Sequence, residues 1–156
     1  MEKTNVMRIL DQRKIPHREY AIGSTEAMSA VEVAAKLGTE ASRTFKTLVT
    51  VGKSRHYYVF MLPGEKTLDL KKAAKAAKEK SIEMIPQKEL LPLTGYVHGG
   101  CSPIGMKKPF PTFIDSSAEN HETIFFSAGK IGYQVEMKLS DLQKAVRVIP
   151  CDLTEE

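Results

Sequence analysis

The chain has 156 residues, of which 42% are hydrophobic and 27% charged, a size and composition typical of one compact domain with a buried core. Its formal charge of +4 favours anionic partners such as nucleic acid without requiring them. Charged residues interrupt residues 1–15, and no apolar run is long enough to span a membrane, so we expect neither a signal peptide nor a membrane segment. Only two cysteines occur, and we expect both to be reduced in a cytoplasmic protein.

Helices are indicated by capping residues that precede runs of apolar residues on one face. The side chains of Thr4, Ser29 and Asp69 can each accept a hydrogen bond from the first turn of such a run. We expect helices from Thr4 to Pro16, from Ser29 to Gly38, from Asp69 to Lys78, over residues 87–91, and from Ser140 or Asp141 onward.

Strands are indicated by short runs of β-branched and aromatic residues bounded by turn residues. The clearest are two runs separated by a turn at Gly52 and Lys53, which predict a β-hairpin. We expect strands at residues 17–22, 44–51, 57–62, 82–85, 112–114, 123–127, 133–137 and 146–149. There is no repeat or low-complexity segment, so the order of elements predicts a single mixed α/β domain over residues 1–156.

Residues 94–105, with the sequence TGYVHGGCSPIG, form the most unusual stretch of the chain because four glycines and a proline lie between two ordered segments. Glycine reaches positive φ and allows the backbone to approach a ligand closely. Gly99 and Gly100 therefore suggest a rigid loop whose N–H groups face a pocket. An ordinary surface turn is the alternative interpretation.

Familiar catalytic and metal-binding motifs are missing. The histidines are scattered, and CxxC, HExxH, GxSxG, Walker and GxGxxG patterns are absent, so we expect no metal and no cofactor. His98 and Cys101 lie three residues apart, which leaves open either a Cys–His nucleophilic pair or a cysteine that only packs. The lysines within residues 71–78 form either a solvated helix face or a contact with RNA phosphates.

Lys46 interrupts a strand that is otherwise apolar or β-branched. The period-2 pattern puts Phe45, Thr47 and Val49 on one face, and Lys46 with Leu48 on the other. A lysine that shares a face with leucine either extends to solvent at an edge or points into a cleft as a fixed cation.

Several short motifs occur in a characteristic order along almost the whole chain. They are TNVMRIL at 4–10, FKTL at 45–48, LDLKK at 68–72, the glycine-rich stretch with SPIG at 102–105, and SAG at 127–129. In order and spacing the chain closely resembles the YbaK/EbsC family of trans-acting aminoacyl-tRNA deacylases, relatives of the editing domain of bacterial prolyl-tRNA synthetase. The resemblance implies an α/β fold in which a central mixed, partly barrel-like sheet is flanked by helices.

The resemblance also implies a reaction, the hydrolysis of cysteine mischarged onto proline tRNA, with Cys-tRNA(Cys) as a further substrate. Cysteine and proline are close in size, and one methylene is worth only about 1 to 3 kcal/mol in a pocket, so a synthetase needs a separate editing site. The implied partners are mischarged tRNA and prolyl-tRNA synthetase. Two alternatives remain: a deacylase for another small amino acid, such as Ala-tRNA(Pro), and a noncatalytic module that binds RNA or aminoacyl-adenosine.

The site residues follow from the match to the family. Lys46 is expected to hold the tRNA 3′ end or the aminoacyl group, while N–H groups near Gly99, Gly100 and Cys101 bind the ester carbonyl. The remaining residues expected around this cleft are Tyr20, Met28, Thr47, Ser127 and Gly129. The resemblance suggests that the thiol of the substrate attacks its own ester, so that Cys101 contributes its backbone and not its sulfur.

Overall fold

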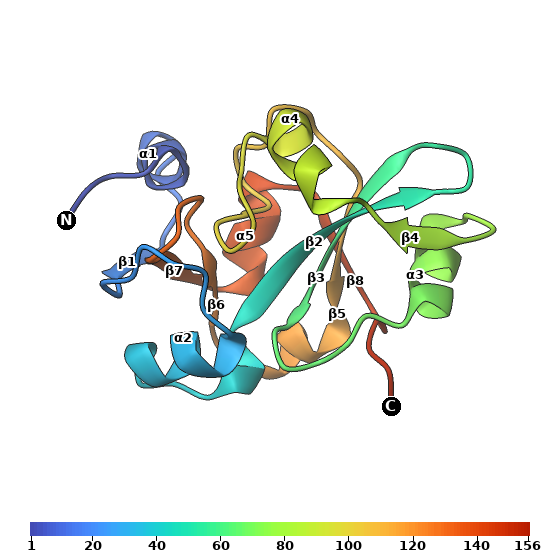
Figure 1. The fold of residues 1–156 in the computed structure, drawn as a ribbon. Helices are drawn as coiled ribbons and strands as arrows, with labels where there is room; N and C mark the ends of the chain where they lie inside the picture. The colour runs from blue at the N-terminus through green and yellow to red at the C-terminus, as the bar shows by residue number, and fades with distance from the viewer.

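The computed structural model describes all residues, 1–156, and contains two β-sheets with helices around them (Figure 1). A three-stranded antiparallel sheet has the order β1-β7-β6, and a five-stranded mixed sheet has the order β4-β2-β3-β5-β8. The two sheets are joined by one parallel bridge between Thr44 and Phe125. The expected mixed sheet flanked by helices is confirmed, and its barrel-like character is limited to this junction because the sheets do not close.

The elements are nearly all those that the sequence predicts. The strands are β1 (Arg18–Ala21), β2 (Phe45–Gly52), β3 (Tyr57–Pro63), β4 (Ile82–Met84), β5 (Thr112–Asp115), β6 (Ile124–Ser127), β7 (Tyr133–Met137) and β8 (Val148–Cys151). The helices are α1 (Asn5–Gln12), α2 (Ala30–Leu37), α3 (Leu70–Ala77), α4 (Leu90–Thr94) and α5 (Leu139–Ala145), with 3-10 turns η1 (Ala41–Arg43), η2 (Gln87–Glu89) and η3 (Ser116–Asn120).

The predicted caps form at three helices. The hydroxyl oxygens of Thr4 and Ser29 accept hydrogen bonds from the N–H groups of Met7 and Glu32, and Asp69 accepts from the first turn of α3. Gly38 ends α2 in the left-handed conformation, with a φ of 70°. Each of these residues satisfies backbone groups that a helix leaves unpaired at its end.

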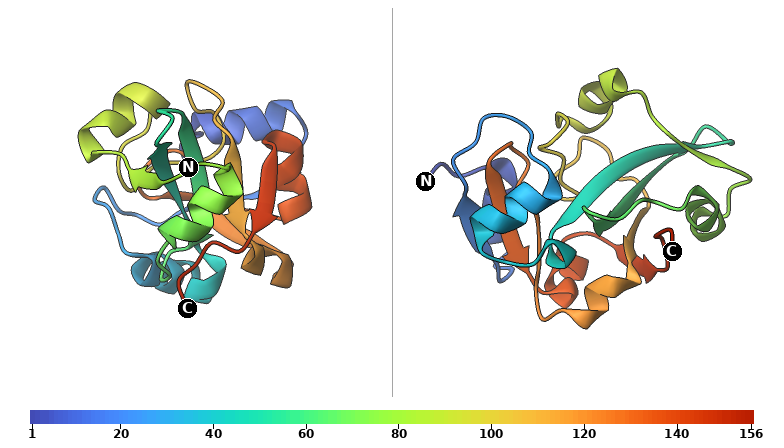
Figure 2. Two further views of the ribbon diagram at one scale, coloured as in Figure 1. Left: turned by 90° about the vertical axis from the view of Figure 1, so that its right-hand side faces the viewer. Right: turned by 60° about the horizontal axis from the view of Figure 1, so that its bottom comes forward.

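Alternation along β3 separates two hydrophobic cores on opposite faces of the five-stranded sheet. Val59 and Met61 belong to the larger core, which also includes residues of α1, α5 and the three-stranded sheet. Phe60 and Leu62 belong to the smaller core, which lies under α3. Figures 1 and 2 show α3 beside β4, at the end of the molecule away from the three-stranded sheet.

Parallel pairing in the larger sheet determines the course of the glycine-rich loop. The hairpin of β2 and β3 is antiparallel, as expected, but β3 pairs with β5 in parallel and β5 pairs with β8 in parallel. Parallel neighbours need a long crossover connection. The chain between β3 and β5 therefore passes through α3, β4 and α4, and then through residues 95–105 before it enters the sheet again.

Several local expectations need correction. The helix expected over residues 87–91 is the 3-10 turn η2 followed by α4, which continues to Thr94. The last strand runs over Val148–Cys151 and not over 146–149, because the N–H of Val146 still donates to Leu142 at the end of α5 and pairing with β5 begins at Val148. The 3-10 turns η1 and η3 were not expected, since one turn is too short to produce a hydrophobic period. None of the helices is long and apolar enough to cross a membrane.

Candidate active site

The site begins at a gap along one edge of β2. On that edge β4 pairs only with residues Thr50–Gly52, and the bridge at Thr44 joins the smaller sheet. The N–H groups of Gly52 and Gly64 donate to the carbonyls of His56 and Thr44, so the backbone N–H and C=O groups of the even-numbered residues of β2 point toward β3. Along a strand these backbone groups point to alternate edges. Those of Thr47 therefore point to the opposite edge, where no strand of the sheet pairs with this residue.

A cavity of about 300 Å³ lies at this gap, between β2, the start of α2, the glycine-rich loop and the smaller sheet. That volume is at the lower end of the range for small-molecule sites. Its lining consists of Met28, Ser29, Ala30, Val33, Thr44, Phe45, Lys46, Thr47, Gly64, Gly99, Cys101, Ser127 and Gln134. Six of the residues expected from the sequence line it together, namely Met28, Lys46, Thr47, Gly99, Cys101 and Ser127.

Lys46 is the only charged residue in this lining. Its ammonium donates hydrogen bonds to the carbonyl oxygens of Lys66 at 2.7 Å and Gly64 at 3.2 Å, and it makes no ion pair with a carboxylate. Burial lowers the pKa of Lys46 below its ordinary value because the charged form loses water. An ammonium has three N–H donors, so one remains for a ligand. Of the two positions that the sequence allows for Lys46, solvent at a strand edge or a cleft, the structure has the cleft.

The glycine-rich loop is held in place by its own hydrogen bonds. The hydroxyl of Tyr96 donates to the carbonyl of Ile104 at 2.5 Å, and burial raises the pKa of Tyr96 to about 12. Gly99 has a φ of 86°, and a Cβ added there would lie 2.6 Å from the Cβ of Ala27. These contacts fix the loop, and residues 97–100 form a hydrogen-bonded turn within it whose residues 97–99 are exposed.

The N–H groups of the loop are not equally free. Gly100 donates its N–H to the carbonyl of Val97 at 2.9 Å, does not line the cavity, and packs against Lys130 and Ile131. Gly99 and Cys101 both line the cavity, and neither of their N–H groups donates a hydrogen bond within the protein. Among the three N–H groups expected to bind a carbonyl, these two have no hydrogen-bond partner within the protein.

Cys101 and His98 do not form a nucleophilic pair. No hydrogen bond joins them, and His98 lines a separate cavity. Burial raises the pKa of the Cys101 thiol to about 12. At neutral pH only about one thiol in 10⁵ would then be ionised, and the thiolate is the nucleophilic form.

Tyr20 and Gly129 do not line this cavity, and Gly129 lines a separate cavity of about 640 Å³. The hydroxyl of Tyr20 donates to Glu136 at 2.6 Å, in a network where the same carboxylate also accepts from Thr123. The N–H of Gly129 donates to the hydroxyl oxygen of Ser127 at 3.1 Å. The hydroxyl of Tyr20 is thus engaged by Glu136, whereas Gly129 is hydrogen-bonded to Ser127, a residue that does line the cavity.

Gln134 and Gly64 are lining residues that the sequence did not predict. The side-chain amide of Gln134 makes no hydrogen bond within the protein although the residue is only 8% exposed. A Cβ on Gly64 would come within 2.1 Å of the Cβ of Ala30, so α2 packs directly on the segment that holds Lys46. A polar glutamine between Tyr133 and Val135 in a short predicted strand is the signal that could have indicated Gln134.

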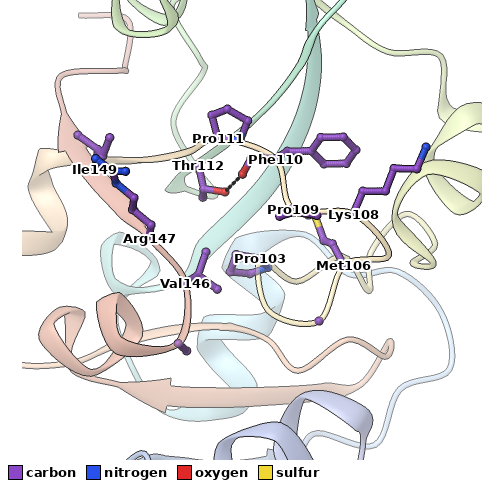
Figure 3. A pocket seen from close by; sticks show the side chains of 12 residues that line it. Pro103, Met106, Lys108, Pro109, Phe110, Pro111, Thr112, Val146, Arg147 and Ile149 are labelled. Atoms are coloured by element: carbon purple, nitrogen blue, oxygen red, sulfur yellow. Dashed lines mark hydrogen bonds between the residues drawn. The ribbon is translucent and has the colours of Figure 1, made fainter.

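A larger cavity, of about 730 Å³, lies between residues 103–112 and the end of α5 (Figure 3). Prolines, Phe110 and Met106 form much of its surface, and Lys108 and Arg147 lie on opposite sides of it. It contains none of the residues expected for the site. Its size alone does not make it a catalytic centre, because no polar groups converge within it.

Asp11, His17 and Glu19 form a cluster in which one ligand atom of each lies within 4.8 Å of the others. The ammonium of Lys3 donates to Asp11 and to Glu19 at 2.8 Å, so these carboxylates already share a cation. We interpret the cluster as an ion-pair network.

Comparisons with known proteins agree on a family. A family model described as the aminoacyl-tRNA editing domain matches residues 24–145. EbsC of Enterococcus faecalis, whose name proposes a Cys-tRNA(Pro)/Cys-tRNA(Cys) deacylase, is 50% identical over 137 residues, which are 87% of this chain and 84% of that protein.

Two solved structures have the same fold. The hypothetical protein APE2540 gives a TM-score of 0.87 at 23% identity, with 99% of this chain and 100% of that chain covered. A proposed trans-editing enzyme for prolyl-tRNA synthetase gives a TM-score of 0.83, also at 23% identity, with the same coverage of both chains.

Proposed function

Because this chain belongs to the family of aminoacyl-tRNA editing domains, we propose that it deacylates tRNA mischarged with cysteine, Cys-tRNA(Pro) and Cys-tRNA(Cys). The observation that carries the proposal is the small cavity at the gap in β2, which is lined by the half-buried Lys46 and by Gly99 and Cys101, whose N–H groups make no hydrogen bond within the protein, and which has no acidic side chain. Such a site favours the electron-rich parts of an aminoacyl ester, its carbonyl oxygen above all.

In this proposal the residues of the cavity bind and polarise the ester. The N–H groups of Gly99 and Cys101 donate to the carbonyl oxygen, on which negative charge develops in the transition state. Lys46 supplies a cation whose position is fixed by its two carbonyl partners. Gln134 and Ser127 offer polar groups to the amino acid, and Met28 and Val33 contribute an apolar wall.

The nucleophile comes from the substrate. The sulfur of the cysteinyl group attacks its own ester carbon, the bond to the ribose oxygen breaks, and cysteine leaves as a thiolactone that water opens to free cysteine. The thiol proton ends on the ribose oxygen. Support comes from the lining itself, which contains no carboxylate or histidine, and whose one thiol is held in its protonated form.

The Cys101→Ala variant tests this division of roles. We expect its kcat/KM for Cys-tRNA(Pro) to stay close to the wild-type value, because alanine keeps the backbone N–H, while stability falls by about 1 kcal/mol as a buried side chain is shortened. Single-turnover deacylation and thermal unfolding measure the two effects. Cys151→Ala, at a half-buried thiol outside the cavity, is the control. Complete loss of activity in Cys101→Ala alone would assign the nucleophile to the protein.

A panel of Cys-, Ser-, Ala- and Pro-tRNA(Pro) tests the reaction itself. A hydroxyl nucleophile needs a general base, worth about 10²- to 10⁴-fold in rate, and none lines the cavity. We therefore expect Ser-tRNA(Pro) to react more slowly than Cys-tRNA(Pro) by a factor of this order, and Ala- and Pro-tRNA(Pro) to be poor substrates. Equal turnover of the cysteine, serine and alanine esters would rule out the substrate-thiol route. Fastest turnover of Ala-tRNA(Pro) would favour a different editing enzyme, and binding without release would favour a noncatalytic module.

We further propose that prolyl-tRNA synthetase supplies the selectivity for the tRNA. A cavity of about 300 Å³ accommodates only a small part of an aminoacyl-tRNA, so recognition of the tRNA body must come from other surfaces. In the same assay, added synthetase should increase the preference for Cys-tRNA(Pro) over Cys-tRNA(Cys). An unchanged preference at saturating synthetase would contradict this partnership.

A further inference from the structure

The cavity lined by His98 adjoins the cavity that contains Lys46. It has a volume of about 190 Å³ and is lined by Thr47, Leu48, Val49, Met84, Ile85, Gln87, Leu90 and His98. It shares Thr47 with the cavity that contains Lys46, and His98 directly precedes Gly99 in the glycine-rich loop. The two cavities are therefore neighbours along the uncovered edge of β2.

The proposed reaction requires such a neighbour. In an aminoacyl-tRNA the amino acid is esterified to the ribose of the terminal adenosine, so the nucleoside must lie directly beside the site that holds the amino acid. The 730 Å³ cavity shares no lining residue with the Lys46 cavity, whereas the 190 Å³ cavity shares Thr47. A ribose at Thr47 would connect an amino acid on one side to a base on the other.

The lining of the second cavity has the chemistry of a site for a purine base. Leu48, Ile85 and Leu90 present aliphatic surface, which suits the faces of a flat ring. The side chains of Gln87 and His98 are exposed and make no hydrogen bond within the protein. A glutamine amide can pair with the donor and acceptor edge of adenine, and an imidazole can stack on an unpaired base.

Two further observations indicate that this region lacks a partner in the free protein. The hydroxyl oxygen of Thr47 is buried without a hydrogen bond, at the junction of the two cavities. Met84, at the rim, leaves 46% of its surface exposed although it is a large apolar residue. A bound nucleoside would offer ribose hydroxyls near the first residue and an apolar base face to the second.

We propose that the cavity lined by Gln87 and His98 binds the base of the terminal adenosine of the substrate, with Gln87 as the residue that selects adenine. This inference rests on the proposed function, since it assumes that the Lys46 cavity holds the aminoacyl group. The ligand class is an adenosine carrying an amino acid on its 3′ oxygen.

Binding of stable analogues tests the inference without turnover. The probe is 3′-cysteinylamino-3′-deoxyadenosine, in which an amide replaces the ester, and its cytidine counterpart is the comparison. We expect the wild type to bind the adenosine probe about five- to 100-fold more tightly, the range that good base recognition gives. Gln87→Ala should remove most of this preference by weakening only the adenosine probe, and His98→Ala should weaken both probes because stacking tolerates any base.

Gln12→Ala, at an exposed glutamine of α1, is the matched control and should bind both probes as the wild type does. Equal binding of the two probes by the wild type, or an unchanged preference in Gln87→Ala, would overturn the adenosine site. The deacylation panel distinguishes this failure from that of the proposed function. Turnover of Cys-tRNA(Pro) without nucleobase preference contradicts only the adenosine site, whereas no turnover of any ester contradicts the function.

Discussion

The Lys46→Met variant is expected to lose about 10²- to 10³-fold in kcat/KM for Cys-tRNA(Pro), the effect of removing one preorganised electrostatic group from an acyl-transfer site. Methionine keeps a flexible chain of similar length but has no charge and no donor. Because Lys46 is the only charged residue lining the cavity, no neighbouring side chain can replace it. Single-turnover deacylation at saturating enzyme separates a loss in the chemical step from a loss in binding.

Stability should change little in the same variant. Burial lowers the pKa of Lys46, so the folded protein holds this proton less tightly than the unfolded chain does, and the charge at pH 7 does not favour folding. Loss of the hydrogen bonds to Gly64 and Lys66 acts in the opposite direction, and we expect a net change of no more than about 1 kcal/mol. Lys53→Met, at an exposed turn, removes the same charge and should keep its activity. A wild-type rate in Lys46→Met would exclude Lys46 from the site.

Much of the fold could be predicted because its signals are local. Thr4, Ser29 and Asp69 cap helices through contacts within one turn, so a single sequence indicates each start. The hairpin of β2 and β3 likewise depends on neighbouring residues. The order of the strands could not be derived in this way, since the parallel pairs of β5 depend on contacts between residues far apart in the chain.

The candidate site was even harder to predict from local signals, because it too depends on contacts between residues far apart in the chain. Met28, Lys46, Gly99 and Ser127 come from four separate segments, and no spacing rule brings them together; only the resemblance to a family predicted that they meet. Gln134 carries no motif and was missed, although it lines the cavity. Conversely, Gly100 and Tyr20 have the expected residue type, but Val97 and Glu136 engage their hydrogen-bonding groups.

The two proposed sites, for the aminoacyl ester and for the adenine base, both lie at the gap along the edge of β2. A strand that lacks a neighbour over part of one edge exposes backbone groups that a ligand can reach. Here β4 and the bridge at Thr44 cover the two ends of that edge. Between them, Phe45 and Lys46 line one cavity, Leu48 and Val49 line the other, and Thr47 lines both. In this proposal, the break in sheet pairing along β2 leaves room for the aminoacyl-adenosine end of the substrate.

The Gly99→Ala variant should lose activity to a similar extent, about 10²- to 10³-fold in kcat/KM, because it moves a donor that the proposed mechanism needs. The φ of 86° is unfavourable for alanine, and the new Cβ would lie 2.6 Å from the Cβ of Ala27, so the loop must shift. A displacement of the N–H groups of Gly99 and Cys101 by even a fraction of an ångström would weaken their hydrogen bonds to the carbonyl oxygen.

Two companion variants separate displacement of the loop from backbone strain. Gly38→Ala has a similar φ of 70° with no atom within 4 Å of the added Cβ, so it should cost roughly 1 kcal/mol of stability and leave kcat/KM unchanged. In the double variant Gly99→Ala with Ala27→Gly, the colliding methyl is removed and a substantial part of the activity should return. Thermal unfolding monitors whether each variant is folded. If Gly99→Ala is folded and fully active, the carbonyl does not bind at this loop; if Gly38→Ala loses as much activity, the effect arises from strain alone.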